Sequence, residues 1–148
     1  MKTVIYLRVS SEQQSKFGFS LENQTDRAVA YCTYKGFENP VVLTESGISG
    51  KRMDNRPRFQ ELLRLIEEKE VDNIVCYSIS RIGRDAADLL NFLKLLTKHD
   101  INIYSTTEGI DGSTPFGRYM IGMIALNAQL EVELISERTS SILQNKKS

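Results

Sequence analysis

The sequence predicts an α/β fold with a mostly parallel central sheet of four or five strands, flanked by helices and ending in a long C-terminal helix that serves oligomerisation. Short β-branched segments alternate with segments of helical period, which is typical of parallel strands joined by crossover helices. Glycine and proline fall between these segments, where turns are needed. No linker or repeat interrupts the pattern, so we expect residues 1–148 to form one domain.

The first half of the chain contains two predicted strands and a helix between them. Residues 2–9, KTVIYLRV, are β-branched and aromatic and predict the first strand. A helix is expected over 21–35, with Ser20 as its N-cap and Gly36 at its end. Residues 40–45, PVVLTE, predict the second strand, and a glycine-containing loop follows.

The second half continues the alternation. Pro57 marks the start of a helix whose apolar residues recur at helical spacing, namely Phe59, Leu62, Leu63 and Ile66. Strands are predicted at 71–79 and 101–106, and the leucine-rich segment 85–98 between them predicts an amphipathic helix.

The last predicted helix, over about 115–144, is apolar on nearly all of its faces in its first half. At this length it would extend about 45 Å, which exceeds the width of so small a domain. A deeply buried core helix is one explanation, and a helix that packs against another subunit is the explanation we favour. The residues expected at that interface are Met120, Met123, Ile124 and Leu130.

Composition limits the chemistry. The 19 basic and 19 acidic residues cancel, which argues against a nucleic-acid binder that depends on bulk charge but leaves room for a local basic site. His99 is the only histidine and the two cysteines have no metal-ligand spacing, so we expect neither a metal nor a cofactor. Both cysteines lie in apolar patterns, which predicts buried thiols in a cytoplasmic protein with no membrane segment.

A serine and an arginine end the first predicted strand. Because side chains alternate along a strand, Arg8 and Ser10 are expected on one face, at the carboxyl edge where open α/β sheets bind ligands. A fixed cation beside a hydroxyl suits a nucleophile that attacks a phosphate. A serine that only ends a strand is the plainer interpretation of so short a motif.

Two further segments bring arginine towards the same edge. SRIGRD at 80–85 follows the third strand, and Arg81 and Arg84 would share a face if the segment were helical. The segment KRMDNRPRF at 51–59 adds Lys51, Arg52, Arg56 and Arg58, a basic loop that could close over an anionic substrate such as DNA. By itself, an ordinary basic surface loop is the plainer interpretation. Together, a serine and several guanidiniums predict phosphoryl transfer without a metal, whereas P-loop and dinucleotide-binding spacings are missing.

Five segments in this order resemble the serine recombinase family: YLRVSSEQQ, GFSLENQ, TESGISGKRMDNRP, SRIGRD and LNAQLEVELISERT. The long spacer after Ser10 is similar to that of the large serine integrases and transposases. The resemblance implies that Ser10 is the nucleophile and that four arginines form the phosphate-binding site, namely Arg8, Arg56, Arg81 and Arg84. It implies supporting roles for Gln14, Gln24, Glu45 and Glu131.

Two positions depart from the family pattern. Ser80 replaces an acid, and Val132 replaces an arginine of the last helix.

The family resemblance implies cleavage of double-stranded DNA sites through a 5′-phosphoserine. It implies a homodimer that assembles into a synaptic homotetramer near the nucleoid, with an accessory directionality factor in some systems. A DNA-binding region is expected beyond the C-terminal helix. The alternatives are an assembly subunit that does not cleave and, more remotely, a nucleotide-binding sensor.

Overall fold

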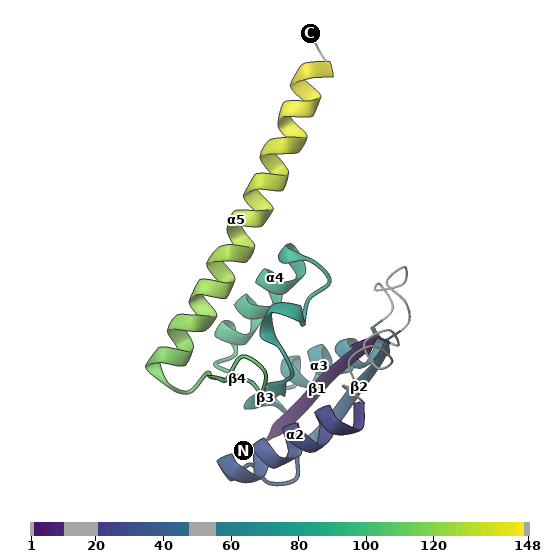
Figure 1. Cartoon of the computed structure of the whole chain (residues 1–148), viewed down its shortest axis with the longest axis vertical. Helices are drawn as coiled ribbons and strands as arrows, with labels where there is room; N and C mark the ends of the chain where they lie inside the picture. The colour runs from purple at the N-terminus through teal and green to yellow at the C-terminus, as the bar shows by residue number, and fades with distance from the viewer. Residues whose placement is uncertain (1, 11–20, 48–55, 147–148) are drawn as a thin grey trace.

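The computed structural model describes residues 2–10, 21–47 and 56–146, and side chains within these ranges except those of Val9, Ser10, Ser46 and residues 143–146. The elements, in chain order, are β1 (Thr3–Ser10), α2 (Leu21–Lys35), β2 (Val41–Gly47), α3 (Pro57–Glu67), β3 (Asn73–Cys76), the 3₁₀ turn η2 (Ile79–Arg81), α4 (Ala86–Lys98), β4 (Asn102–Ser105), β5 (Ile110–Asp111) and α5 (Pro115–Lys146). The predicted α/β class and the long final helix are confirmed (Figure 1).

The sheet has five strands in the order β2-β1-β3-β4-β5. The first four strands are parallel, and β5 pairs antiparallel with β4 at one edge. A strand of two residues is too short to show a period, which explains why the sequence did not reveal β5 individually. Parallel order places the carboxyl ends of β1, β2 and β3 along one edge of the sheet.

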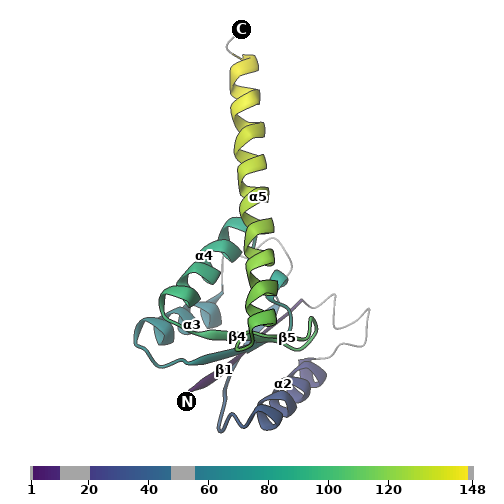
Figure 2. The same ribbon diagram turned by 90° about the vertical axis from the view of Figure 1, so that its left-hand side faces the viewer.

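Helices cover both faces of the sheet, with α2 on one side and α3 and α4 on the other (Figure 2). Because successive side chains of β1 point to opposite faces, Ile5 and Leu7 pack with the α2 residue Ala28, whereas Val4 and Tyr6 enter the larger core on the other side. Cys32 and Cys76 are buried, unpaired thiols, as predicted.

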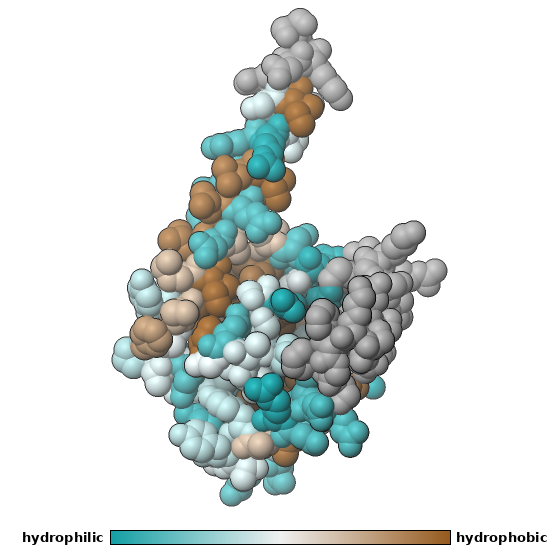
Figure 3. All heavy atoms as spheres, viewed as in Figure 1, coloured by the Kyte–Doolittle hydropathy of each residue, from teal (hydrophilic) through white to brown (hydrophobic). Residues whose placement is uncertain are grey.

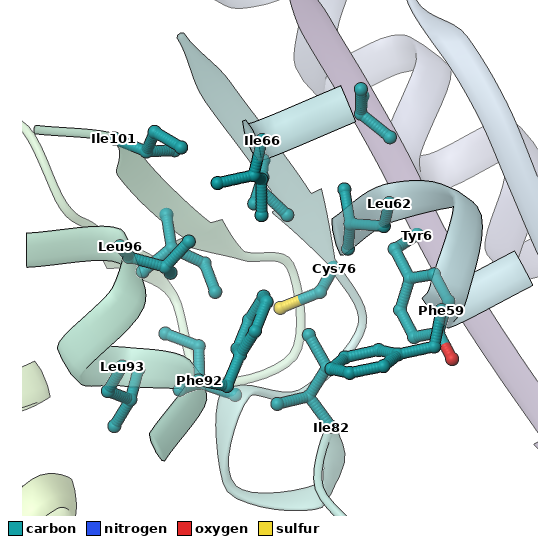
Figure 4. Packing of buried hydrophobic residues seen from close by; sticks show 14 of the residues in the cluster. Tyr6, Phe59, Leu62, Ile66, Cys76, Ile82, Phe92, Leu93, Leu96 and Ile101 are labelled. Carbon is teal, nitrogen blue, oxygen red and sulfur yellow. The ribbon is translucent and has the colours of Figure 1, made fainter. Parts of the chain in front are cut away.

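The larger core joins α3, α4 and the sheet (Figure 4). Phe59, Leu62 and Ile66 are buried at the predicted helical spacing. The ring of Phe59 lies 5.7 Å from that of Tyr6 and 5.2 Å from that of Phe92, measured between centroids. The core therefore fixes the start of α3 directly beneath β1, near the strand's carboxyl end.

The helix α5 packs against the domain only through its first half and then extends away from it (Figures 1 and 2). Two of the four predicted interface residues, Met120 and Ile124, are partly buried against the chain's own core, and their place at a subunit interface stays a prediction. Met123 and Leu130 are exposed, and apolar side chains continue along the projecting half (Figure 3). None of the described helices combines the length and apolarity needed to cross a membrane.

Candidate active site

The candidate site lies at the carboxyl edge of β1 and β3. Ser10 is the last residue of β1 and is opposite Gly47, the last residue of β2. Its side chain lies outside the described part of the structure, so the expected position of its hydroxyl stays a prediction. Next to it, β3 ends at Cys76 and the chain continues into the segment that carries Arg81 and Arg84.

This segment is a turn anchored by two apolar residues. Ile79 and Ile82 are buried in the core, and the arginines at 81 and 84 are exposed. The condition under which the two arginines would share a helical face is not met, because η2 ends at Arg81 and α4 begins only at Ala86. We refer to residues 79–84 as the arginine turn.

The arginine turn lies closely against the start of α4. A Cβ atom on Gly83 would come within 2.7 Å of the backbone nitrogen of Leu89, so this position has no space for a side chain. The N-cap of α4 is Asp85, whose side chain accepts a hydrogen bond from the backbone N–H of Asp88 at 2.8 Å. Close contact and capping together fix the turn relative to the helix.

Two of the predicted active-site arginines hold the turn by its carbonyl oxygens. Arg8 donates from Nη1 to the oxygen of Gly83 at 3.4 Å, and Arg56 donates from Nη1 to that of Ile82 at 3.1 Å. Burial lowers the pKa of Arg8, because desolvation disfavours its charged form, and the neighbouring Arg56 adds to this effect. An arginine nevertheless stays protonated at physiological pH.

Arg56 is buried just before α3 and is engaged on three sides. Besides Ile82, it forms an ion pair of 2.7 Å with Asp88 and lies 4.0 Å from the centroid of the Phe59 ring. The Asp88 carboxylate also accepts a hydrogen bond from the backbone N–H of Arg84 at 2.9 Å. Arg58, by contrast, is an exposed residue of α3 paired with Glu61 at 3.0 Å.

Glu45 is buried on β2 and stabilises the start of α3. Its carboxylate accepts hydrogen bonds from the Tyr6 hydroxyl at 3.3 Å and from the backbone N–H of Phe59 at 3.1 Å. Burial raises the pKa of Tyr6 and the Glu45 carboxylate raises it further, so the phenol stays neutral and continues to donate. This contact sets the position of Arg56, three residues before Phe59, relative to β1.

The remaining supporting residues are placed differently. Gln24 is buried in the first turn of α2, and its Oε1 has no hydrogen-bond partner among the described residues. Glu131 is an exposed residue of α5 and lines a pocket of about 340 Å³ together with Ser80 and Arg84. The structure therefore brings α5 to the same pocket as the arginine turn.

Comparisons with known proteins show the family to which this chain belongs. The family model described as the resolvase N-terminal domain matches residues 3–148. The chain belongs to the resolvase family of serine recombinases. It is 32% identical over 139 residues to the transposon Tn917 resolvase of Enterococcus faecalis, which covers 94% of this chain and 67% of that protein. It is 31% identical to the serine recombinase gin of Escherichia phage Mu, over 90% of this chain and 62% of that protein.

Two solved recombinase structures share the fold. The N-terminal catalytic domain of TP901-1 integrase is 32% identical, with a TM-score of 0.70 over 90% of this chain and 98% of that domain. A resolvase family site-specific recombinase from Streptococcus pneumoniae is 29% identical, with a TM-score of 0.78 over all of this chain and 99% of that one. Against its first curated relatives, the chain spans between 51% and 67% of their length.

Several residues expected to matter in this recombinase domain cannot be placed. Gln14, Lys51 and Arg52 lie outside the described ranges, as does the side chain of Ser10. Among the described residues, no group of three or more His, Cys, Asp or Glu side chains is arranged to hold a metal ion. The described part of the site is therefore made of the arginine turn and the side chains that contact it.

Two acidic residues of this site were missed by the sequence analysis. Asp88 joins Arg56 to the arginine turn, and Glu108, from the segment after β4, contacts the start of that turn. An Asp-x-x-Asp pattern at a helix start could have suggested the cap contact of Asp85 with the Asp88 N–H, but not the ion pair of Asp88 with Arg56. Glu108 gave no local signal, because its partner Ser80 is 28 residues away in the sequence.

Proposed function

We propose that this chain is the catalytic domain of a site-specific DNA recombinase in which Ser10 cleaves the phosphodiester backbone and later rejoins it. The observation that supports this most is the arginine turn: Arg81 and Arg84 are exposed beside the end of β1, on a backbone held by Arg8 and Arg56. Exposed guanidiniums on a fixed backbone are suited to binding a phosphate in one orientation.

The chemistry follows from these groups. The Ser10 oxygen attacks the phosphorus and loses its proton, while the bond to the 3′-oxygen breaks and that oxygen leaves as a protonated hydroxyl. The product is a serine joined to the 5′-phosphate. Attack by the 3′-hydroxyl of another strand reverses each step and releases the serine. Each step exchanges one phosphoester bond for another, so no ATP is needed. In this proposal the arginines supply the charge stabilisation that a metal ion would otherwise give.

Each arginine has a different role in the proposed reaction. Negative charge builds on the non-bridging oxygens in the transition state, and in this proposal Arg81 and Arg84 stabilise it. Arg8 lies nearer Ser10 along β1 and can contact the same phosphate while holding the turn. Arg56 is committed to protein contacts, so binding of its guanidinium to DNA would require its ion pair to open.

The proposed substrate is a pair of double-stranded DNA sites, brought together by a homodimer that becomes a homotetramer. The exposed apolar residues along α5 support such assembly, because a single domain leaves them in water: Leu126, Leu130, Leu134, Ile135 and Ile142. A location near the nucleoid and an accessory directionality factor stay predictions.

A second candidate function is an assembly subunit that does not cleave. Ser80 and Val132, which depart from the family pattern, favour it. Ser80 is exposed on the arginine turn, and Val132 lies on α5 one residue after Glu131. A subunit of this kind would join a tetramer through α5 and leave strand cleavage to its partners.

The two functions differ in one measurable product. The native-length protein that carries this chain is incubated in EDTA with a supercoiled plasmid that bears its recombination sites, and the reaction is stopped with detergent. We expect protein attached covalently to the DNA 5′ ends, and none with Ser10→Ala. A folded, DNA-bound wild type that forms no attachment would favour the assembly subunit.

A further inference from the structure

The start of the arginine turn is held by a carboxylate from the segment between β4 and β5. Glu108 accepts a hydrogen bond on Oε1 from the backbone N–H of Ile79 at 2.6 Å. On Oε2 it accepts one from the hydroxyl of Ser80 at 3.0 Å. Both oxygens of one side chain are thus directed at two consecutive residues that immediately precede Arg81.

The backbone around Glu108 is itself fixed to the end of β3. Its N–H donates to Ser105 Oγ at 3.1 Å, and that hydroxyl donates to the carbonyl oxygen of Tyr77 at 3.1 Å. The N–H of Thr107 donates to the same carbonyl at 3.0 Å. Gly109, with a φ of +66°, then lets the chain turn back into β5. The carboxylate is therefore presented from a well-defined position.

The arginine turn depends on such outside support. Its own hydrogen bonds are long, at 3.4 Å from the N–H of Arg81 to the oxygen of Ser78 and 3.3 Å from that of Ile82 to the oxygen of Ile79. Arg8 and Arg56 hold its second half by the carbonyl oxygens of Gly83 and Ile82. Glu108 is the counterpart for the first half, where the N–H and hydroxyl donors lie.

We propose that Glu108 is a positioning residue for strand cleavage: it sets the direction of the arginine turn, and with it the reach of Arg81 towards the scissile phosphate. The inference rests on the proposed function. Glu108 acts through the length and hydrogen bonds of its side chain, since both groups that it binds are uncharged donors. Neither contact requires a negative charge.

A glutamine at this position can reproduce both contacts. Its amide oxygen accepts from the N–H of Ile79, and its amide NH₂ donates to Ser80 Oγ. The Ser80 hydroxyl is then free to donate to Ser78 Oγ, which already lies 3.1 Å away. An aspartate keeps the charge but is one methylene shorter, so it cannot reach both donors from the same backbone.

The test compares Glu108→Gln, Glu108→Asp and Glu108→Ala in the native-length protein. The rate of covalent attachment to DNA 5′ ends is measured together with gel-shift affinity for the uncut site and the melting temperature. We expect Glu108→Ala to cleave about 10²-fold more slowly and Glu108→Asp about tenfold more slowly, because the phosphate ligands are misplaced. Glu108→Gln should stay within about threefold of wild type, since both hydrogen bonds can reform.

Affinity for the uncut site should change little, because the Glu108 carboxylate contacts donors of the protein itself. Glu68→Ala is the matched control, since Glu68 is an exposed glutamate in a surface pair with Arg64 and should keep the wild-type rate. If Glu108→Ala does not fold, the comparison of glutamine with aspartate still decides the matter.

Two results would overturn the inference. In one, the aspartate variant is active and the glutamine variant is slow, which would show that the charge acts directly in proton transfer or on the arginines. In the other, all three variants cleave like wild type. A wild type that forms no serine-dependent attachment would instead show that the proposed function itself has failed.

Discussion

Arg56 and Asp88 form a nearly buried ion pair of 2.7 Å that connects the start of α3 to the start of α4. The side chains are 7% and 18% exposed, so little water screens the two charges. The same carboxylate accepts a hydrogen bond from the backbone of Arg84, and the same guanidinium donates to the carbonyl of Ile82. The pair therefore organises the arginine turn as well as the packing of two helices.

Removing one partner should destabilise the domain markedly. We expect Asp88→Ala to lower the free energy of unfolding by about 3 kcal/mol, because Arg56 is left buried and unpaired. Urea unfolding measures the change, and Glu68→Ala in the exposed Arg64–Glu68 pair should cost about 0.5 kcal/mol or less. An Asp88→Ala domain as stable as the control would show that Arg56 finds water or another partner in solution.

Replacing the exposed arginines should separate catalysis from folding. Arg81→Ala and Arg84→Ala are expected to change the free energy of unfolding by about 0.5 kcal/mol or less, as is usual for surface positions. Each should slow covalent attachment to DNA by about 10²–10³-fold, by analogy with the loss of one transition-state donor. Rapid-quench assays measure the rate, and a wild-type rate in either variant would remove that arginine from the site.

Gly83 and Gly122 give a matched pair of glycine substitutions. Gly83→Ala would place a Cβ atom 2.7 Å from the Leu89 backbone, and we expect a loss of stability of about 1–3 kcal/mol together with slower cleavage. A Cβ atom added at Gly122, on α5, would meet nothing within 4 Å, so Gly122→Ala should stabilise the helix by about 0.5–1 kcal/mol. Thermal unfolding of both variants tests this difference, and equal effects would show that the close approach is not maintained.

The free energy of unfolding at acidic pH should depend on Asp111. Burial alone would raise the pKa of Asp111, but hydrogen bonds from Lys35 and Ser113 outweigh it and lower the pKa below the usual 3.8. A depressed carboxyl pKa contributes stability above the unfolded value, and this stability is lost as pH falls through the folded value, here below about pH 4. In Asp111→Asn, the free energy of unfolding should therefore depend less on pH below about pH 4 than it does in the wild type.

The pKa of Lys35, the basic partner of Asp111, is shifted in the opposite direction. The hydrogen bond to Asp111 is the main cause that raises the pKa of Lys35 above 10.5. Its contribution is complete below that value and is lost as pH rises through the folded pKa, so the pair supports the fold across the neutral range. Denaturant titrations at several pH values test the role of Asp111 on the acid side. A parallel loss of stability in the wild type and in Asp111→Asn on acidification would contradict that role.

Much of the fold could be predicted from periodicity, and the errors have local causes. The strand expected at 71–79 ends at Cys76, because Ile79 is apolar for a different reason: it anchors the arginine turn in the core. The helix expected at 85–98 begins one residue later, with Asp85 as its cap. One side of the first half of α5 packs against α4 and the core, which accounts for the apolar residues on that side only.

The arginines of the candidate site and, by family resemblance, Glu45 and Glu131 could be named from the sequence, whereas Asp88 and Glu108 could not. Arg8, Arg81 and Arg84 belong to short motifs that can be recognised locally. Their acidic supports act over long distances along the chain: Asp88 is 32 residues from Arg56, and Glu108 is 28 residues from Ser80. Which surface residues meet across a sheet edge depends on strand order and register, and neither follows from periodicity alone.

The most direct test of the central proposal is to locate the covalent bond. The native-length protein is trapped on its DNA sites, digested with protease and nuclease, and analysed by mass spectrometry. We expect a nucleotide phosphate attached to the peptide that contains Ser10, through its hydroxyl and the DNA 5′ end. Attachment to another side chain, or cleaved DNA that carries no peptide, would contradict the assignment of Ser10 as the nucleophile.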